Sequence, residues 1–84
     1  MKNKVLIKLI IPSIEEELDL YLPLNKSVGK IIELLKKSLP ALTDKRFEAT
    51  NFLNLYNKYT GKRYDLDIII LNTDIRNGSV LIFI

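Results

Sequence analysis

The apolar segment at the end of the sequence constrains the fold more than any other part of it. Residues 80–84 are five consecutive apolar residues, and Asn77-Gly78 supplies a turn signal shortly before them. A strand that is apolar on both faces is typical of the interior of a sheet, where it has a neighbour on each side. We therefore expect residues 80–84 to lie at the centre of a sheet.

Two segments near the start of the chain have the pattern of strands: the first is apolar, with the lysines in and before it at even positions only, and the second alternates between apolar and polar residues. They span residues 5–11 and 15–22, and Pro12-Ser13 separates them. Alternation with a period of two predicts strands that bury one face. The residues predicted to face the core are Val5, Ile7, Leu9, Ile11, Leu18, Leu20 and Leu22. The two segments together predict an antiparallel hairpin.

The apolar pattern changes to a helical period after Pro23. The expected buried stripe is Val28, Ile31, Ile32, Leu35 and Leu39. This spacing predicts an amphipathic helix, with Ser27 as its N-cap and Pro40 as its end. Gly29 is a local conflict, because glycine inside a helix costs up to about 1 kcal/mol relative to alanine.

The segment after this helix has weaker signals. Thr43 or Asp44 is a candidate cap for a short helix that runs through Phe47. Residues 52–58 predict another strand, with a turn at Thr60-Gly61 and a return through residues 62–64.

Residues 65–71 are ambiguous between strand and helix. Their three consecutive isoleucines favour a strand, but the polar segment Asn72-Thr73-Asp74 follows directly.

The order of these elements predicts an α+β fold. The two most apolar strands, residues 5–11 and 80–84, belong at the centre of the sheet, and the helix covers one face because no other element is large enough. We predict a β-grasp domain over residues 1–84, with a mixed four- to five-stranded sheet and one main helix across it.

The chain resembles ubiquitin over nearly its whole length. Residues 18–22 resemble the second ubiquitin strand leading into its helix, and residues 59–62 resemble the hairpin turn that ends in Gly-Lys. Ile75 and residues 81–83 resemble the final loop and strand.

A narrower resemblance is to the bacterial YukD/EsaB family. Residues 57–62 and 75–81 are similar to these small ubiquitin-like proteins, which are associated with the WXG100-type (type VII, Esx-like) secretion systems of Gram-positive bacteria. The resemblance implies a non-conjugated accessory or adaptor protein that acts by protein–protein contact in the cytoplasm, with components of a secretion machinery as partners.

Conjugation and sulfur carriage in the ubiquitin superfamily need a flexible tail that ends in Gly-Gly. This sequence ends in Ile82-Phe83-Ile84, so we expect neither activity. The apolar segment near the N-terminus is interrupted by Lys8 and is too short for a signal peptide or a membrane span. We therefore expect a cytoplasmic protein with no membrane insertion.

The residue types present argue against an enzyme. The 84 residues include no cysteine and no histidine, so Ser-His and Cys-His nucleophiles and the usual zinc ligands are excluded. Thr60-Gly61-Lys62 lacks the earlier glycine of a phosphate loop, and Glu15-Glu16-Glu17 is typical of a solvated strand edge. We expect no catalytic residues, no cofactor and no metal.

Charge gives little support to nucleic-acid binding. The 13 Lys and Arg against 10 Asp and Glu give a net charge of +3, but the basic residues are spread from Lys2 to Arg76. A basic β-grasp domain that binds nucleic acid is therefore the weakest alternative.

The sheet face that the helix leaves open is the candidate binding site. Side chains alternate between the two faces of a strand, and this alternation places on the open face Leu6, Lys8, Ile10, Tyr56, Lys58, Val80, Ile82 and Ile84. Contiguous exposed apolar surface usually marks an interaction site, so we expect a protein partner here. Homo-oligomerisation through the same face is the alternative. Its apolar character has two further explanations, which are cover by residues 41–51 and hydrophobic residues that are tolerated singly at the surface.

Overall fold

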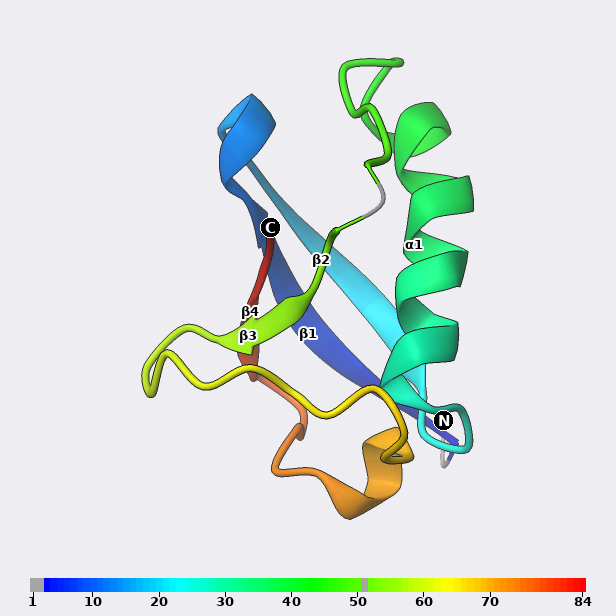
Figure 1. The fold of residues 1–84 in the computed structure, drawn as a ribbon, viewed down its shortest axis with the longest axis vertical. Helices are drawn as coiled ribbons and strands as arrows, with labels where there is room; N and C mark the ends of the chain where they lie inside the picture. The colour runs from blue at the N-terminus through cyan, green and yellow to red at the C-terminus, as the bar shows by residue number, and fades with distance from the viewer. Residues whose placement is uncertain (1–2, 51) are drawn as a thin grey trace.

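The computed structural model describes residues 3–50 and 52–84. Its strands are β1 (Lys4–Ile11), β2 (Glu16–Pro23), β3 (Leu55–Asn57) and β4 (Val80–Phe83). The helix α1 (Val28–Leu42) packs across one face of the sheet (Figure 1). Two short 3-10 helices, η1 (Pro12–Ile14) and η2 (Ile70–Asn72), lie in the connections.

The strand order β2-β1-β4-β3 confirms that the first and last strands are central. β1 pairs antiparallel with β2 and parallel with β4, and β3 pairs antiparallel with β4. A parallel pair needs a long crossover connection, and the chain between β1 and β4 carries α1 onto one sheet face. This is the predicted β-grasp arrangement, with four strands in the described part of the chain.

The hairpin between β1 and β2 forms as the alternation predicts. Its register pairs Val5 with Leu22 and Leu9 with Leu18, so inward residues lie opposite inward residues. Glu15, expected as the first residue of the second strand, instead closes the turn in a left-handed conformation with φ 51° and donates its N–H to Pro12 O at 3.2 Å.

The start of α1 is held by a side-chain cap and by a distant loop. Ser27 Oγ accepts the N–H of Lys30 at 3.1 Å, which confirms the predicted N-cap. The N–H groups of Val28 and Gly29 donate to Ile68 O and Leu66 O, each at 2.9 Å. Donors that a helix start normally leaves unpaired are therefore satisfied by residues 66–68.

The predicted end of the helix at Pro40 is wrong, because α1 continues to Leu42. Proline removes its own N–H from the helix and crowds the carbonyl four residues before it, but here the last turn is secured by other bonds. Thr43 donates both its N–H, at 2.9 Å, and its hydroxyl, at 2.7 Å, to Leu39 O. Leu39 is fully buried and anchors this last turn.

The predicted short helix through Phe47 does not form. Asp44 and Lys45 have φ of 57° and 64°, and this left-handed conformation ends the helical path. Phe47 is nevertheless buried, and its ring stacks on Phe83 with 5.8 Å between centroids.

The strand predicted over residues 52–58 is shorter in the structure, where β3 is Leu55–Asn57. Pairing with the end of the chain extends to Asn54, whose N–H donates to Ile84 O at 2.8 Å. The predicted return arm is reduced to a single bridge between Tyr56 and Arg63. Asn51 lies outside the described residues.

The isoleucines of residues 65–71 do not form a strand. Ile69 makes one bridge, to Ser27, and η2 begins at Ile70. Only Ile70 of the three is buried, whereas Ile68 and Ile69 are 38% and 41% exposed. The segment instead supplies backbone acceptors to α1, a role that its hydropathy does not indicate.

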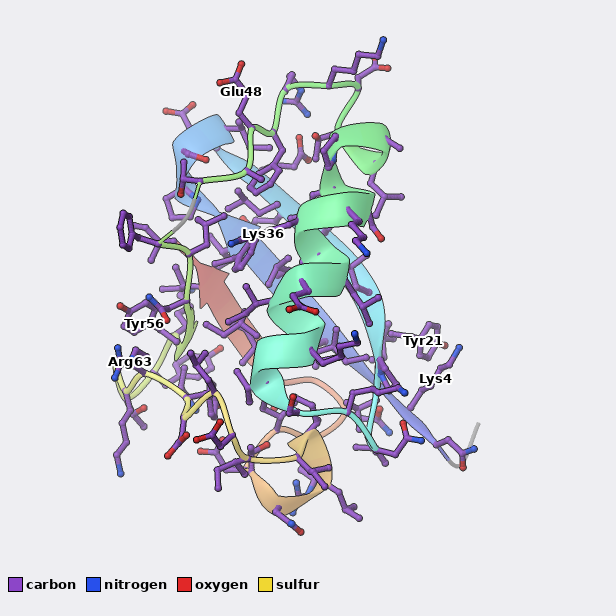
Figure 2. The ribbon with its side chains drawn as sticks, turned by 45° about the vertical axis from the view of Figure 1, so that its right-hand side comes forward. Lys4, Tyr21, Lys36, Glu48, Tyr56 and Arg63 are labelled. Atoms are coloured by element: carbon purple, nitrogen blue, oxygen red, sulfur yellow. The ribbon has the colours of Figure 1, made fainter. Side chains whose placement is uncertain are left out.

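The core lies between α1 and the sheet face that it covers (Figure 2). All members of the predicted helix stripe and all four predicted inward residues of β1 are buried. From β2 only Leu22 is fully enclosed, while Leu18 and Leu20 are partly buried against the core because β2 is an edge strand. The remaining buried apolar residues are Phe47, Leu55, Ile70, Ile75, Leu81 and Phe83.

Candidate functional site

The face of the sheet opposite α1 forms a surface that we call the open face. Side chains of a strand alternate between the two faces, so the buried Leu9, Leu81 and Leu55 mark the core side. Their neighbours on the strands point the other way. Figure 2 shows Tyr56 directed away from α1.

The register brings residues from three strands into rows on the open face. Ile82 lies opposite Ile10 on β1 and opposite Tyr56 on β3. In the next row Lys8 lies opposite Val80, and Lys58 donates its N–H to Val80 O at 3.1 Å. These cross-strand neighbours form a continuous apolar strip with a lysine at each end of the second row.

The remaining predicted residues extend this strip at its two ends. Leu6 is 39% exposed at one end, and Ile84 is 55% exposed at the other. Ile10, Tyr56, Val80 and Ile82 are half-buried because they cover one another across the strands. The eight residues singled out from the sequence therefore belong to one surface.

Charged groups border the apolar strip of the open face. Lys8 Nζ lies 4.0 Å from Glu17 Oε1, and both side chains are largely exposed. Asp19 lies opposite Lys8 across the β1–β2 pair. Lys58 Nζ lies 5.8 Å from the centroid of the Tyr59 ring. Lys2, at an even position like Lys8, lies outside the described residues.

Two side chains next to this surface were missing from the sequence prediction. Tyr21 lies opposite Leu6 and is 58% exposed, so it extends the open face onto β2. The alternation of β2 already predicts that Tyr21 points away from the core. The pairing of Tyr21 with Leu6 is the further fact that places it on the open face. Arg63 lies beside Tyr56 through their bridge, at the place where the sequence predicted the return arm of a hairpin.

Residues 41–50 do not account for the apolar character of the open face. Phe47 stacks on Phe83, which is buried on the core side of β4. Arg46 forms an ion pair with Glu16. Glu16 lies opposite the buried Ile11, so its side chain is also on the core side of the sheet. The described part of the segment therefore packs with the helix layer.

A hydrogen-bonded cluster closes the hairpin after β3. The Tyr64 hydroxyl donates to Asp74 Oδ1 at 2.6 Å, and Asn57 Nδ2 donates to Tyr64 Oη at 3.2 Å. Burial, together with the bond to Asp74, raises the pKa of Tyr64 to about 12. The Tyr64 hydroxyl therefore stays protonated and acts as a structural hydrogen-bond donor, which holds the hairpin after β3 to the loop before β4.

The part of the chain that the structure describes has neither an acidic cluster suited to a metal nor a membrane-spanning helix. Within residues 3–50 and 52–84, no three acidic side chains gather into a possible metal-binding group. None of the helices in the described part of the chain has the length and hydropathy needed to cross a bilayer.

No protein-family model and no curated protein matches this sequence. Solved structures do match. The ubiquitin-like domain of the Mycobacterium tuberculosis type VII secretion protein ECCD1 is 14% identical, with a TM-score of 0.75 over 96% of this chain and 97% of that one.

Two other structures match in the same way. A chain of the MycP5-free ESX-5 inner membrane complex is 16% identical, with a TM-score of 0.70 over 96% of this chain and 20% of that one. A chain of a toluene 4-monooxygenase complex with the inhibitor 4-bromobenzoate is 10% identical, with a TM-score of 0.74 over 95% of both chains.

These likenesses establish the fold. At such low identity the shared backbone says nothing of activity, and the matches include both secretion components and a chain from an enzyme complex. The chain therefore has a ubiquitin-like β-grasp fold, as the sequence resemblance predicts.

Proposed function

We propose that this chain is a ubiquitin-like module that binds a protein partner through its open face. The observation that carries the proposal is the row Ile10–Ile82–Tyr56, an apolar strip across three strands on the side away from α1. Contiguous apolar surface rimmed by charge is typical of protein interaction sites. On this proposal the module acts by non-covalent contact, without a catalytic step.

For the partner, we propose a cytoplasmic component of a type VII secretion machinery, with the chain as a YukD/EsaB-like accessory factor. The sequence resemblance supports this assignment, as does the similarity of the fold to the ECCD1 domain and to part of the ESX-5 complex.

Complementation of a gene deletion tests this proposal. Deletion should lower secretion of WXG100-class substrates, and the wild-type gene should restore it. Ile82→Asp places a charge in the middle of the apolar strip and should not restore secretion, although the protein folds. Ile68→Asp is the control, because Ile68 is 38% exposed but lies in the loop before η2. Secretion that is unaffected by deletion would contradict the assignment.

A homodimer through the open face is the second candidate function. The face carries Glu17 and Asp19 near the β2 edge and Lys58 near the β3 edge, so two copies packed face to face about a two-fold axis parallel to the strands would bring opposite charges together. Light scattering over a range of concentrations distinguishes the two functions. A mass that doubles with concentration in the wild type but not in Ile82→Asp would favour the dimer.

A further inference from the structure

The β2 strand forms one edge of the sheet and has backbone groups that point away from it. Lys8 donates its N–H to Ser79 O and Leu6 O accepts from Gly78 N–H, so even-numbered β1 residues bond toward β4. Odd-numbered β1 residues therefore bond toward β2, where their partners are even-numbered. The N–H and C=O groups of Glu17, Asp19 and Tyr21 consequently face outward, away from β1.

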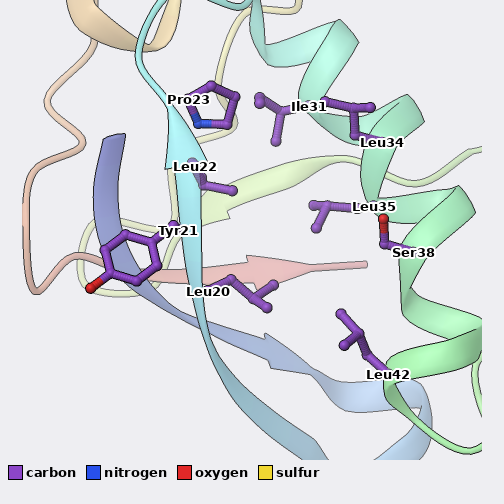
Figure 3. A pocket seen from close by; sticks show the side chains of 9 residues that line it. All are labelled: Leu20, Tyr21, Leu22, Pro23, Ile31, Leu34, Leu35, Ser38 and Leu42. Atoms are coloured by element: carbon purple, nitrogen blue, oxygen red, sulfur yellow. The ribbon is translucent and has the colours of Figure 1, made fainter. Parts of the chain in front are cut away.

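An apolar groove lies beside this edge, between β2 and α1. The cavity has a volume of about 300 Å³ and its lining is mostly leucine. Figure 3 shows Leu20 and Leu22 directed toward the helix side chains, whereas the Tyr21 ring points away from them. On the helix side, Leu34 and Leu42 are 40% and 54% exposed, so both remain available to a ligand.

The two ends of the groove limit what can occupy it. At one end Pro23 has no N–H to offer to an added strand. At the other end the Arg46–Glu16 ion pair joins the segment after α1 to the first residue of β2. The free edge between these limits runs over residues 17–21, which matches an added strand of about five or six residues.

Charge indicates which strand would fit. Side chains of an added strand would alternate between the groove and the opposite face, where they would lie beside Glu17 and Asp19 at cross-strand distances of about 5 Å. Glu17 and Asp19 are exposed and belong to the edge strand itself, whereas Lys8 is one strand further in. Lys30 and Lys37 are also exposed, four residues before and three residues after Leu34 on α1, so they flank the helix side of the groove and not the side of Glu17 and Asp19.

A second copy of this chain fits this edge poorly. Two β2 strands paired edge to edge about a two-fold axis would place Glu17 and Asp19 of one copy against the same acidic residues of the other. Like charges directly opposite each other in a sheet are destabilising. The edge therefore favours a partner of opposite charge.

We propose that the β2–α1 groove is a second docking site, separate from the open face, which accepts an extended segment of a protein partner as an added strand. The segment would alternate aliphatic residues, which enter the groove, with lysine or arginine residues, which lie beside Glu17 and Asp19. Backbone bonds to the edge strand supply affinity, and the alternating side chains supply selectivity.

The test uses amide-resolved NMR titration of the whole chain with two hexapeptides, both capped at their ends. One alternates lysine with isoleucine, and the other alternates glutamate with isoleucine. The lysine peptide should bind at least about tenfold more tightly. It should slow hydrogen exchange at the amides of Asp19 and Tyr21 and shift the methyl signals of Leu34 and Leu42. Equal affinity for the two peptides would overturn the proposal, and so would binding of neither.

Three variants make the assignment specific. Tyr21→Pro removes an outward N–H without taking a bond from β1, so the protein should fold but lose the peptide. Glu17→Lys combined with Asp19→Lys should reverse the preference toward the glutamate peptide. Ile82→Asp should bind the lysine peptide as the wild type does, because it alters only the open face. Shifts centred on Val80 and Ile82, or loss of binding in Ile82→Asp, would place the peptide on the open face and overturn this second site.

Discussion

Ile82 lies directly opposite Ile10 across the parallel pair of β4 and β1, on the sheet face that α1 leaves open. The same isoleucine lies opposite Tyr56 on the other side. This pairing depends on the last strand lying between the first and third strands; the apolar residues 80–84 predict its central position, and the structure gives its register. The topology thus turns three separate apolar residues into one strip.

Gly29→Ala should destabilise the protein, although alanine is the better helix former by about 1 kcal/mol. A Cβ at this position would lie 3.2 Å from Leu66 O, which the Gly29 N–H already binds at 2.9 Å. The added methyl group would push the loop away from the helix start.

Urea denaturation of the variant measures this effect, with Ser38→Ala as the control on an exposed site of the same helix. We expect Ser38→Ala to be neutral or slightly stabilising. A Gly29→Ala protein more stable than the wild type would contradict this prediction, because it would show that the loop at Leu66 moves aside at little cost in free energy.

Thr43→Val should cost about 1–3 kcal/mol of the free energy of unfolding, the usual penalty for an unpaired buried donor. The Thr43 hydroxyl accepts the Phe47 N–H at 3.1 Å, and Thr43 is only 2% exposed. Valine keeps the shape but leaves this N–H without a partner.

The same substitution at Thr60 is the matched control for Thr43→Val, measured by denaturant titration. Thr60 Oγ1 accepts the Lys62 N–H in an exposed turn, where water can replace it. We expect a change of less than about 0.5 kcal/mol there. Equal losses at the two positions would contradict the role given to the buried bond.

Tyr64 should make the protein less stable as the solution becomes strongly alkaline. Its pKa is raised from about 10 to about 12, so the folded protein holds the proton more tightly than the unfolded chain does. The stabilising contribution is complete below pH 10 and is lost progressively as the pH rises from about 10 through about 12.

Denaturant titrations across this pH range should show a shallower loss for Tyr64→Phe than for the wild type. Tyr59→Phe, which alters a 77% exposed ring, should behave as the wild type does. If Tyr64→Phe and the wild type lose stability in parallel, the folded structure does not raise the pKa of Tyr64 as we infer.

The sequence predicts those parts of the fold in which one residue pattern decides the structure. Alternation in β1 and β2 and the Ser27 cap were sufficient, because each depends on neighbouring residues. The end of α1 was not predictable from Pro40, because bonds from Thr43 carry the helix past it. Residues 65–71 were ambiguous because their role is to supply carbonyl groups to α1, and any residue type has a carbonyl group.

The candidate site was predictable to a similar extent. Parity alone placed the eight residues on one face, and the structure adds their order within it. The β2–α1 groove was not predicted, since Leu34 and Leu42 lie outside the helical stripe of the core. Apolar residues off that stripe were the signal that could have indicated it.

Photo-crosslinking in cells that contain the secretion machinery tests the central claim most directly. A photoreactive residue is placed either at Leu6, on the open face, or at Ile68, on the loop before η2. These positions are 39% and 38% exposed, so access to solvent does not distinguish them. Our account predicts a crosslink to a component of the secretion machinery from position 6 and none from position 68. Equal crosslinking from both positions, or crosslinking from position 68 alone, would contradict it.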